Sequence, residues 1–288
     1  MKLVSTIGFV FLWLILSLMT ADAFEPSKEF RQYCGSCHGP AGNGQGKAAR
    51  YLYPKPRDLV NGRMRFATST NLVASADDLK RVIKNGIPGT SMQNWSVLND
   101  DLIDRLVVEI GEMQKLGARL RAENEVREDG NYVDANGTVT KAGESLILRY
   151  IEMETVPGSI WKIPEISLSG SDTEQIAAGR AVYLKQNCHK CHAEDGSGSW
   201  GLDLVDGRGF PTFARDLRRD PLKAGHEIES MARVIRLGMA GTAMPSSDNL
   251  SDIDLLFLVK YVRSLGTEPK LELGNIQRYH RAIGFSPE

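Results

Sequence analysis

The five-residue stretch CGSCH at residues 34–38 recurs as CHKCH at residues 188–192, and the two stretches hold all four cysteines of the chain. Both follow the pattern CxxCH, in which two thiols form thioether bonds with the vinyl groups of a haem and the adjacent histidine binds its iron. The spacing places both cysteines on one side of a helical turn and lets the histidine reach the metal. We therefore expect two covalently bound c-type haems, attached through Cys34, Cys37, His38, Cys188, Cys191 and His192.

A structural zinc site is the alternative explanation for two CxxC pairs. In such a site the pairs lie roughly 15–20 residues apart, so that four sulfur atoms surround one ion. Here Cys34 and Cys188 are 154 positions apart, and a histidine directly follows each pair. The spacing favours haem, and it leaves no cysteine for a disulfide or a nucleophile.

The size and composition of the chain indicate a protein of about two globular domains. It has 288 residues, of which 42% are hydrophobic and 25% charged, as is usual for soluble proteins. The formal net charge is −1. We therefore expect no basic face for nucleic acid.

Residues 1–23 have the pattern of a secretory signal peptide. Lys2 precedes an apolar run at residues 7–19, and Ala21-Asp22-Ala23 forms a small-residue cleavage site. The alternative is an uncleaved anchor, but the apolar run is shorter than the roughly 20 residues that a membrane span needs. We expect cleavage before Phe24, a periplasmic protein, and no membrane span after cleavage, since bacteria attach haem covalently outside the cytoplasmic membrane.

Capping residues and apolar periodicity predict a similar series of helices in each half of the chain. Ser27 is a candidate N-cap in the first half, and so is Asn99 or Asp100. The last helix of the first half is expected to continue into the charged stretch at 119–129, with Ile103, Leu106, Ile110, Met113 and Leu120 on one face. The expected helices are residues 27–37, 77–84 and from 99 or 100 onward, then 173–188, 227–237 and 251–265.

The two halves are related by an internal repeat. At an offset of 152 residues, seven of the twelve positions from Arg81 to Met92 are identical to those from Arg233 to Met244. The shared residues include the pattern GxxGTxM, which ends each segment. We infer that the halves are tandem copies of one domain.

A methionine thioether is the second axial ligand that the repeat predicts for each iron. This soft ligand favours ferrous iron and raises the reduction potential. Of the nine methionines, only Met92 and Met244 stand at equivalent positions, and the preceding glycines let the backbone come close to a porphyrin. We predict these two as iron ligands, and we expect Met64, Met113 and Met231 to fill the core.

Two arginines are candidates for binding the carboxylates of haem. Arg57 and Arg215 each begin the tripeptide RDL, and guanidinium groups pair well with carboxylates. An ordinary surface position is the alternative. His226 and His280 would serve a bis-histidine haem, but neither has a counterpart in the first half, so we do not expect them to bind iron.

These motifs resemble the tandem diheme form of the class I cytochrome c family, which includes cytochrome c4 and diheme subunits of respiratory oxidoreductases. The resemblance rests on CGSCHGPAGNGQG with GIPGTSM, and on CHKCHAEDGSG with GMAGTAMP. It covers residues 27–113 and 173–265. It implies small all-α domains with crossed first and last helices, His38 and His192 as proximal ligands, and Met92 and Met244 as distal ones. One departure is Gln93, which follows the first methionine where the second half has Pro245.

The expected fold is therefore all-α, with two tandem cytochrome c domains joined by a long linker or insert. We place a signal peptide at 1–23, domain 1 at 24–113, the insert at 114–172, and domain 2 with a C-terminal tail at 173–288. Within the insert, an Asn-Gly turn at residues 136–137 predicts a small β-hairpin. The insert is either a brace between domains or a docking site for a partner.

The resemblance implies one-electron transfer and not catalysis, because two filled sixth sites leave no open iron. The expected partners are redox proteins such as a molybdenum oxidoreductase, a quinol-oxidising complex or a terminal oxidase. One alternative is a diheme enzyme of the peroxidase type, which needs a displaceable distal ligand. Another is an obligatory electron-transfer subunit of a larger complex. A cysteine-ligated catalytic haem, as in thiosulfate-oxidising cytochromes, is excluded by the cysteine count.

Overall fold

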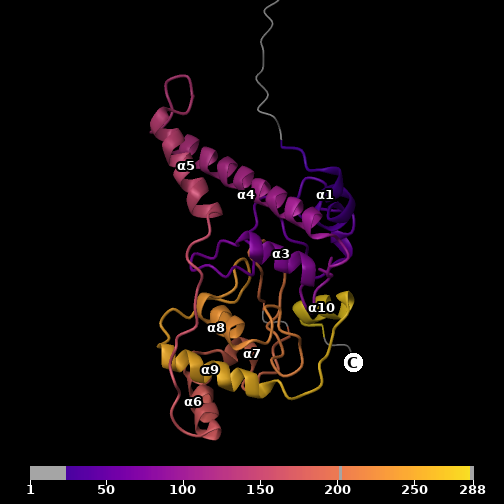
Figure 1. The fold of residues 1–288 in the computed structure, drawn as a ribbon, viewed down its shortest axis with the longest axis vertical. Helices are drawn as coiled ribbons and strands as arrows, with labels where there is room; N and C mark the ends of the chain where they lie inside the picture. Colours follow the sequence, from indigo (N-terminus) through magenta and orange to yellow (C-terminus); the bar gives the residue numbers. More distant parts are fainter. Residues whose placement is uncertain (1–23, 201–202, 286–288) are drawn as a thin grey trace, which may run out of the picture.

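The computed structural model describes residues 24–200 and 203–285, so the expected signal peptide at 1–23 lies outside the described residues. The described part of the chain is helical and contains no named strand, which confirms the all-α prediction. Figure 1 shows two halves stacked along the longest axis, with α1, α3 and α4 in one and α6, α8 and α9 in the other. The helices are α1 Lys28–Tyr33, α2 Gly35–His38, α3 Ala76–Asn85, α4 Asp100–Asp129, α5 Lys141–Thr155, α6 Asp172–Lys185, α7 His189–His192, α8 Ile228–Leu237, α9 Asp252–Leu265 and α10 Asn275–Ala282, with a short 3-10 turn at Ala49–Tyr51.

Side-chain caps fix where several helices begin. In α1, α4, α6 and α9, the N-cap side chain accepts a hydrogen bond from a backbone N–H three residues further on, which satisfies a group that the helix cannot pair. These N-caps are Ser27, Asn99, Ser171 and Ser251.

The helices expected at 27–37 and 173–188 are shorter than predicted. The first ends at Tyr33 and the second at Lys185, and each CxxCH turn then forms a short helix of its own. In the second half the interruption has a clear backbone cause, because Asn187 has a φ of 60°, outside the right-handed helical region.

The core of the first half lies between α1, α3 and the first part of α4. Phe30, Ile103 and Met113 are fully buried there, and the Ser27 hydroxyl donates to Glu109 Oε2 at 2.7 Å, which ties α1 to α4. The prediction for Leu120 was wrong, because its side chain is 49% exposed. At that point α4 has passed beyond the first core.

In the second half, α6 and α9 cross closely. Tyr183 and Tyr261 are buried at the crossing and meet edge to face, with ring centroids 5.2 Å apart. A Cβ atom on Gly179 would lie only 2.1 Å from the carbonyl oxygen of Phe257. The approach of the two helices therefore depends on a residue without a side chain.

The insert is mostly a helical hairpin. Helix α4 continues without a break past residue 113, and α5 packs antiparallel against its second part, away from the rest of the molecule (Figure 1). The expected β-hairpin is reduced to a single antiparallel bridge between Val133 and Val139. The small core of this hairpin includes Ala122, Val126 and Ile147.

The end of the insert connects the two halves. The backbone N–H of Thr70 donates to Ser159 O at 2.9 Å, and that of Trp161 donates to Thr68 O at 2.8 Å. The Trp161 side chain packs against the core of the second half. This end segment of the insert therefore bridges the two halves.

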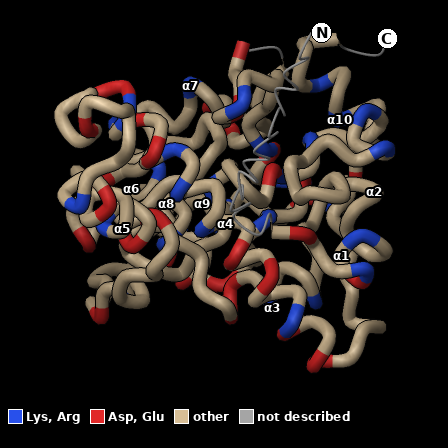
Figure 2. The backbone as a smooth tube through the Cα atoms, turned by 90° about the horizontal axis from the view of Figure 1, so that it is seen from above, with Lys and Arg blue, Asp and Glu red and all other residues tan. Residues whose placement is uncertain are grey.

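Helix α10 lies at the junction of the two halves (Figure 1). Its buried side chains are those of Arg278, Arg281 and Ala282, whereas Ile276 and Tyr279 are exposed. Within residues 24–200 and 203–285, no helix is both long and apolar enough to span a bilayer. Seen from above in Figure 2, basic and acidic positions are mixed along the backbone of both halves.

Candidate haem sites

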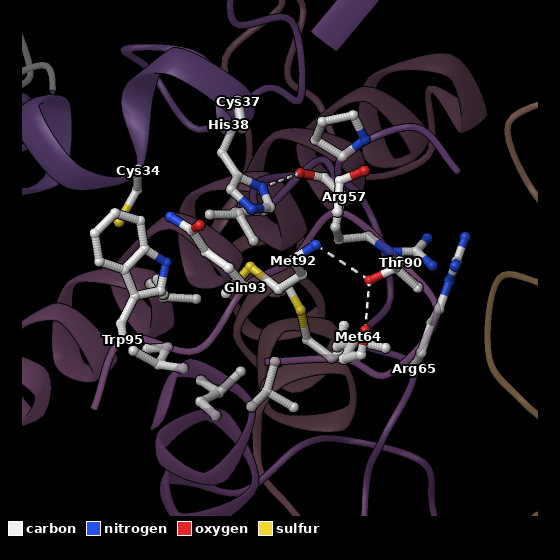
Figure 3. Close-up of a pocket in the computed structure, with 18 of the residues that line it drawn as sticks. Cys34, Cys37, His38, Arg57, Met64, Arg65, Thr90, Met92, Gln93 and Trp95 are labelled. Atoms are coloured by element: carbon white, nitrogen blue, oxygen red, sulfur yellow. Dashed lines mark hydrogen bonds between the residues drawn. The ribbon is translucent and has the colours of Figure 1, made fainter. Parts of the chain in front are cut away.

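Each half contains a cavity that begins at its CxxCH turn. The first has an empty volume of about 1370 Å³ and the second about 1500 Å³, the open solvent at their mouths included. Cys34, Cys37 and His38 line the first, which Figure 3 shows with Trp95 on one side and Arg57 on the other. The corresponding residues Cys188, Cys191 and His192 line the second.

The four thiols are free and lie in two separate cavities. Among the residues that the structure describes, no group of three or more His, Cys, Asp or Glu side chains is arranged to hold a metal ion. A single zinc ion bound by both CxxC pairs is therefore incompatible with this fold.

Both histidines of the CxxCH motifs are held by a backbone carbonyl group. Nδ1 of His38 lies 2.8 Å from Arg57 O, and Nδ1 of His192 lies 3.0 Å from Arg215 O. Because a carbonyl oxygen can only accept, Nδ1 carries the proton in each ring and Nε2 keeps a free lone pair. Burial also lowers the pKa of both imidazoles, which favours the neutral form. This is how a metal-binding histidine is usually oriented.

The loop that carries Met92 is fixed by its own hydrogen bonds. Ile87 N–H donates to Met92 O at 2.8 Å, Thr90 Oγ1 donates to Ile87 O at 2.8 Å, and Met92 N–H donates to Thr90 Oγ1 at 3.1 Å. Gly86 begins the loop with a φ of 68°, a conformation that favours glycine. The repeated residues of GxxGTxM thus build a closed turn that presents the methionine to the cavity.

The second methionine loop has the same construction. The equivalent three hydrogen bonds measure 3.1, 2.8 and 3.2 Å, and the first glycine has a φ of 72°. Gln93 in place of proline therefore leaves the first loop with the same hydrogen bonds as the second. The residues concerned are Gly238, Met239, Thr242 and Met244.

Each cavity also contains another methionine besides the predicted ligand. Met64 lines the first cavity, and Figure 3 shows its side chain and that of Met92 pointing into the same space. Met231 and Met239 line the second cavity together with Met244. His226 and His280 are not among the described lining residues of either cavity.

Arg57 and Arg215 are placed reciprocally between the halves. Each lines the cavity of its own half and reaches the methionine loop of the other. A Cβ on Gly89 would lie 2.7 Å from Arg215 Nη1, and one on Gly241 would lie 2.7 Å from Arg57 Nη1. Sequence reasoning identified these arginines but not the contact across the interface.

Further cationic side chains gather at the same interface. Arg65 lines both cavities, and Lys223 lines the second. Burial, together with neighbouring positive charges, lowers the pKa of Arg57 to about 9 and that of Lys223 well below its usual range. Arg65 and Lys223 were not predicted from the sequence, because neither belongs to a repeated motif.

The residues present fit a c-type haem in each cavity. Free thiols and a correctly oriented imidazole lie at one wall and a methionine loop at another. Within the described residues, Arg57 Nη2 and Arg65 Nε are buried without a hydrogen-bond partner. These unpaired guanidinium N–H groups, in a region of excess positive charge, could donate hydrogen bonds to the two carboxylates that every haem carries.

The fold and the two cavities define a tandem protein of the class I cytochrome c type. The chain belongs to the family described as cytochrome C oxidase, cbb3-type, subunit III, whose model matches residues 21–108 and 174–262. Cytochrome c domains imply haem c, and two matched segments correspond to two haems. No curated protein matches the sequence.

A solved structure shows the same arrangement over most of the chain. It is a chain of the Kuenenia stuttgartiensis reducing HAO-like protein complex Kustc0457/Kustc0458. The two share 25% sequence identity with a TM-score of 0.63, and the match covers 84% of this chain and 98% of the other. The similarity therefore extends over most of the chain.

Proposed function

We propose that this chain is a periplasmic diheme cytochrome that transfers single electrons between redox proteins. The observation that carries the proposal is the duplicated site, in which a carbonyl-bound histidine faces a cavity with a methionine loop. When bound, each haem supplies a one-electron iron couple. The chain's own residues would set the potential of that couple through ligand choice, burial and nearby charge.

In this proposal, His38 and His192 are the proximal ligands and Met92 and Met244 the distal ligands. The carbonyl groups of Arg57 and Arg215 hold each imidazole with Nε2 available. The guanidinium groups of the same arginines are positioned to neutralise haem carboxylates. With a histidine and a methionine both binding each iron, no coordination site would be left for a substrate, which is why we propose a carrier and not a peroxidase.

The partner is proposed to be a larger oxidoreductase. The structural relative is part of a reducing HAO-like protein complex. By analogy, the present chain would carry electrons to or from an oxidoreductase with which it associates. Periplasmic location is supported by the sequence pattern of residues 1–23 and by the site of covalent haem attachment in bacteria.

The ligand assignment can be tested by comparing methionine variants within one cavity. We expect Met92→Leu to remove the weak Met-to-iron charge-transfer absorption of one ferric haem and to lower its potential, because the thioether favours ferrous iron. Met64→Leu is the matched control, since Met64 lines the same cavity. The measurement is the absorption spectrum of the purified ferric protein.

The second cavity offers the same comparison, with Met244→Leu as the test and Met239→Leu as the control. If the control variants lose the band and the test variants keep it, the ligand assignment is wrong. Rapid turnover of peroxide by the wild-type protein would favour the enzyme alternative.

A further inference from the structure

Arg208 and Arg281 contact equivalent positions of the two halves, although the internal repeat does not align one arginine with the other. Gly44 and Gly198 are each the sixth residue after the histidine of a CxxCH motif. A Cβ on Gly44 would lie 2.9 Å from Arg208 Nη1, and one on Gly198 would lie 2.4 Å from Arg281 Nη2. Each guanidinium group therefore lies against the same point of the loop behind the histidine.

Both arginines also hold the segment that orients the histidine. Nη2 of Arg208 donates to Pro56 O at 2.7 Å, and Nη2 of Arg281 donates to Ala214 O at 3.3 Å. Each of these carbonyl groups directly precedes the arginine whose own carbonyl accepts from the histidine Nδ1. One peptide unit thus separates the guanidinium contact from the histidine contact.

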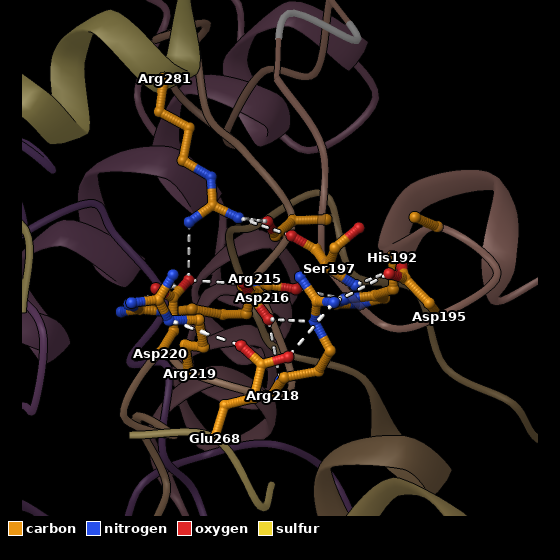
Figure 4. A network of polar contacts seen from close by, with 12 residues as sticks. His192, Asp195, Ser197, Arg215, Asp216, Arg218, Arg219, Asp220, Glu268 and Arg281 are labelled. Atoms are coloured by element: carbon orange, nitrogen blue, oxygen red, sulfur yellow. Dashed lines mark hydrogen bonds and ion pairs between the residues drawn. The ribbon is translucent and has the colours of Figure 1, made fainter. Parts of the chain in front are cut away.

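Each arginine comes from outside the loops that it supports. Arg208 belongs to a turn of the second half and reaches the first cavity's loop, whereas Arg281 belongs to α10. Arg281 is 3% exposed and is fixed by an ion pair with Asp220 Oδ2 at 2.9 Å. It also donates to Ser197 O at 3.3 Å (Figure 4). Its guanidinium lies 4.7 Å from the centre of the Phe213 ring.

We propose that Arg208 and Arg281 are positioning residues for the proximal histidines, His38 and His192 respectively. The inference rests on the proposed ligation of iron by these histidines. A carbonyl held in place fixes the plane of the imidazole ring and the strength of the Nδ1–H hydrogen bond, which raises the basicity of the ligand. The basicity of each proximal histidine thereby depends on an arginine from a distant segment of the chain.

Helix α10 provides a matched control for this proposal. Arg278, on the same helix, is also buried, but it binds the first half: Nε donates to Tyr53 O at 2.7 Å and Nη2 donates to Ser91 Oγ at 3.2 Å. Loss of Arg278 loosens α10 without removing a donor from Ala214 O. A variant at this position therefore separates detachment of the helix from loss of the positioning contact.

The test uses the full haem-loaded chain and charge-preserving variants. In Arg281→Lys, we expect the proton shifts of the ferric haem methyl groups, which report the orientation of the axial ligands, to change for the haem attached at Cys188 and Cys191. The potential of that haem should rise, because a weaker Nδ1–H bond makes the histidine a poorer donor to ferric iron. The other haem should keep its shifts and potential. Arg208→Lys should give the opposite pattern, with changes at the haem attached at Cys34 and Cys37.

The proposal is overturned if either variant leaves both haems unchanged or affects both equally. It is also overturned if Arg278→Lys changes the second haem as much as Arg281→Lys does. Failure of the proposed ligation would look different, because the wild-type protein itself would then lack two histidine-ligated haems in its spectrum, and failure of the proposed carrier function would appear as rapid turnover of peroxide by the wild-type protein.

Discussion

At the scale of single residues, Arg65 is the side chain through which the two sites are most directly linked. Among the described residues, it alone lines both cavities. Its side chain is 12% exposed, and Nη2 lies 3.5 Å from Asp206 Oδ2 of the second half. A largely buried positive charge at this position would raise the reduction potential of both proposed iron centres, because the protein interior screens charges less than water does.

We expect Arg65→Gln to lower both reduction potentials. Removal of a positive charge disfavours the ferrous state, which has one electron more. Arg63→Gln is the control, because Arg63 is exposed and lines neither cavity. A potentiometric titration followed by absorption checks the result, and a change confined to one haem would contradict the shared role.

The site residues that could be predicted from sequence are those that belong to a short, recognisable sequence motif. The thiols, both histidines and both methionines stand in repeated patterns, and the structure brings each set to one cavity. Arg208 and Arg281 could not be found in this way. Their roles depend on contacts between segments that are far apart in the sequence, and no sequence spacing relates Arg208 to Arg281.

At the scale of elements, the crossing of α6 and α9 organises the second half. Gly179 makes the crossing possible because its missing side chain leaves room for a backbone carbonyl of α9. Helix α4 contains a contrasting residue, Gly111, where a Cβ would meet nothing within 4 Å.

We therefore expect Gly179→Ala to lower the free energy of unfolding by about 1–3 kcal/mol, the usual range for overpacking. Gly111→Ala should raise it by up to about 1 kcal/mol, because alanine is the better helix former and the site is open. Urea unfolding of the two variants measures both effects. A stable Gly179→Ala protein would show that the helices can move apart without loss.

The longer helices of the two repeated halves were predicted from capping residues and apolar periodicity, whereas α5 of the insert was not, and neither was α10. It has only eight residues, and two of its three buried side chains are arginines. No apolar periodicity marks such a helix, since it is held by hydrogen bonds to distant carbonyl groups. The expectation for Leu120 was wrong for a related reason. The apolar pattern of α4 continues after the first core has ended, and the sequence does not show where the elements that pack against α4 stop.

At the scale of the whole molecule, several separate segments join the two halves. The end of the insert pairs with residues 68–70, Arg208 reaches Pro56, and α10 binds both halves through Arg278 and Arg281. The halves repeat one plan, but they are not connected by a simple linker.

These connections predict that the full chain unfolds in one transition. Calorimetry should show a single peak whose measured enthalpy equals the van't Hoff enthalpy, because neither half can open without breaking contacts of the other. Two resolved peaks would show that the halves are thermodynamically independent.

The reciprocal arginines have a practical consequence for protein engineering. Arg57 rests on Gly241 and Arg215 rests on Gly89, so each half completes the methionine loop of the other. A single half cut out for use on an electrode or in a fusion would expose the arginine that the other half covers, and its methionine loop would lose the arginine that packs against it. Both halves must therefore be kept together when this cytochrome is transferred to another system.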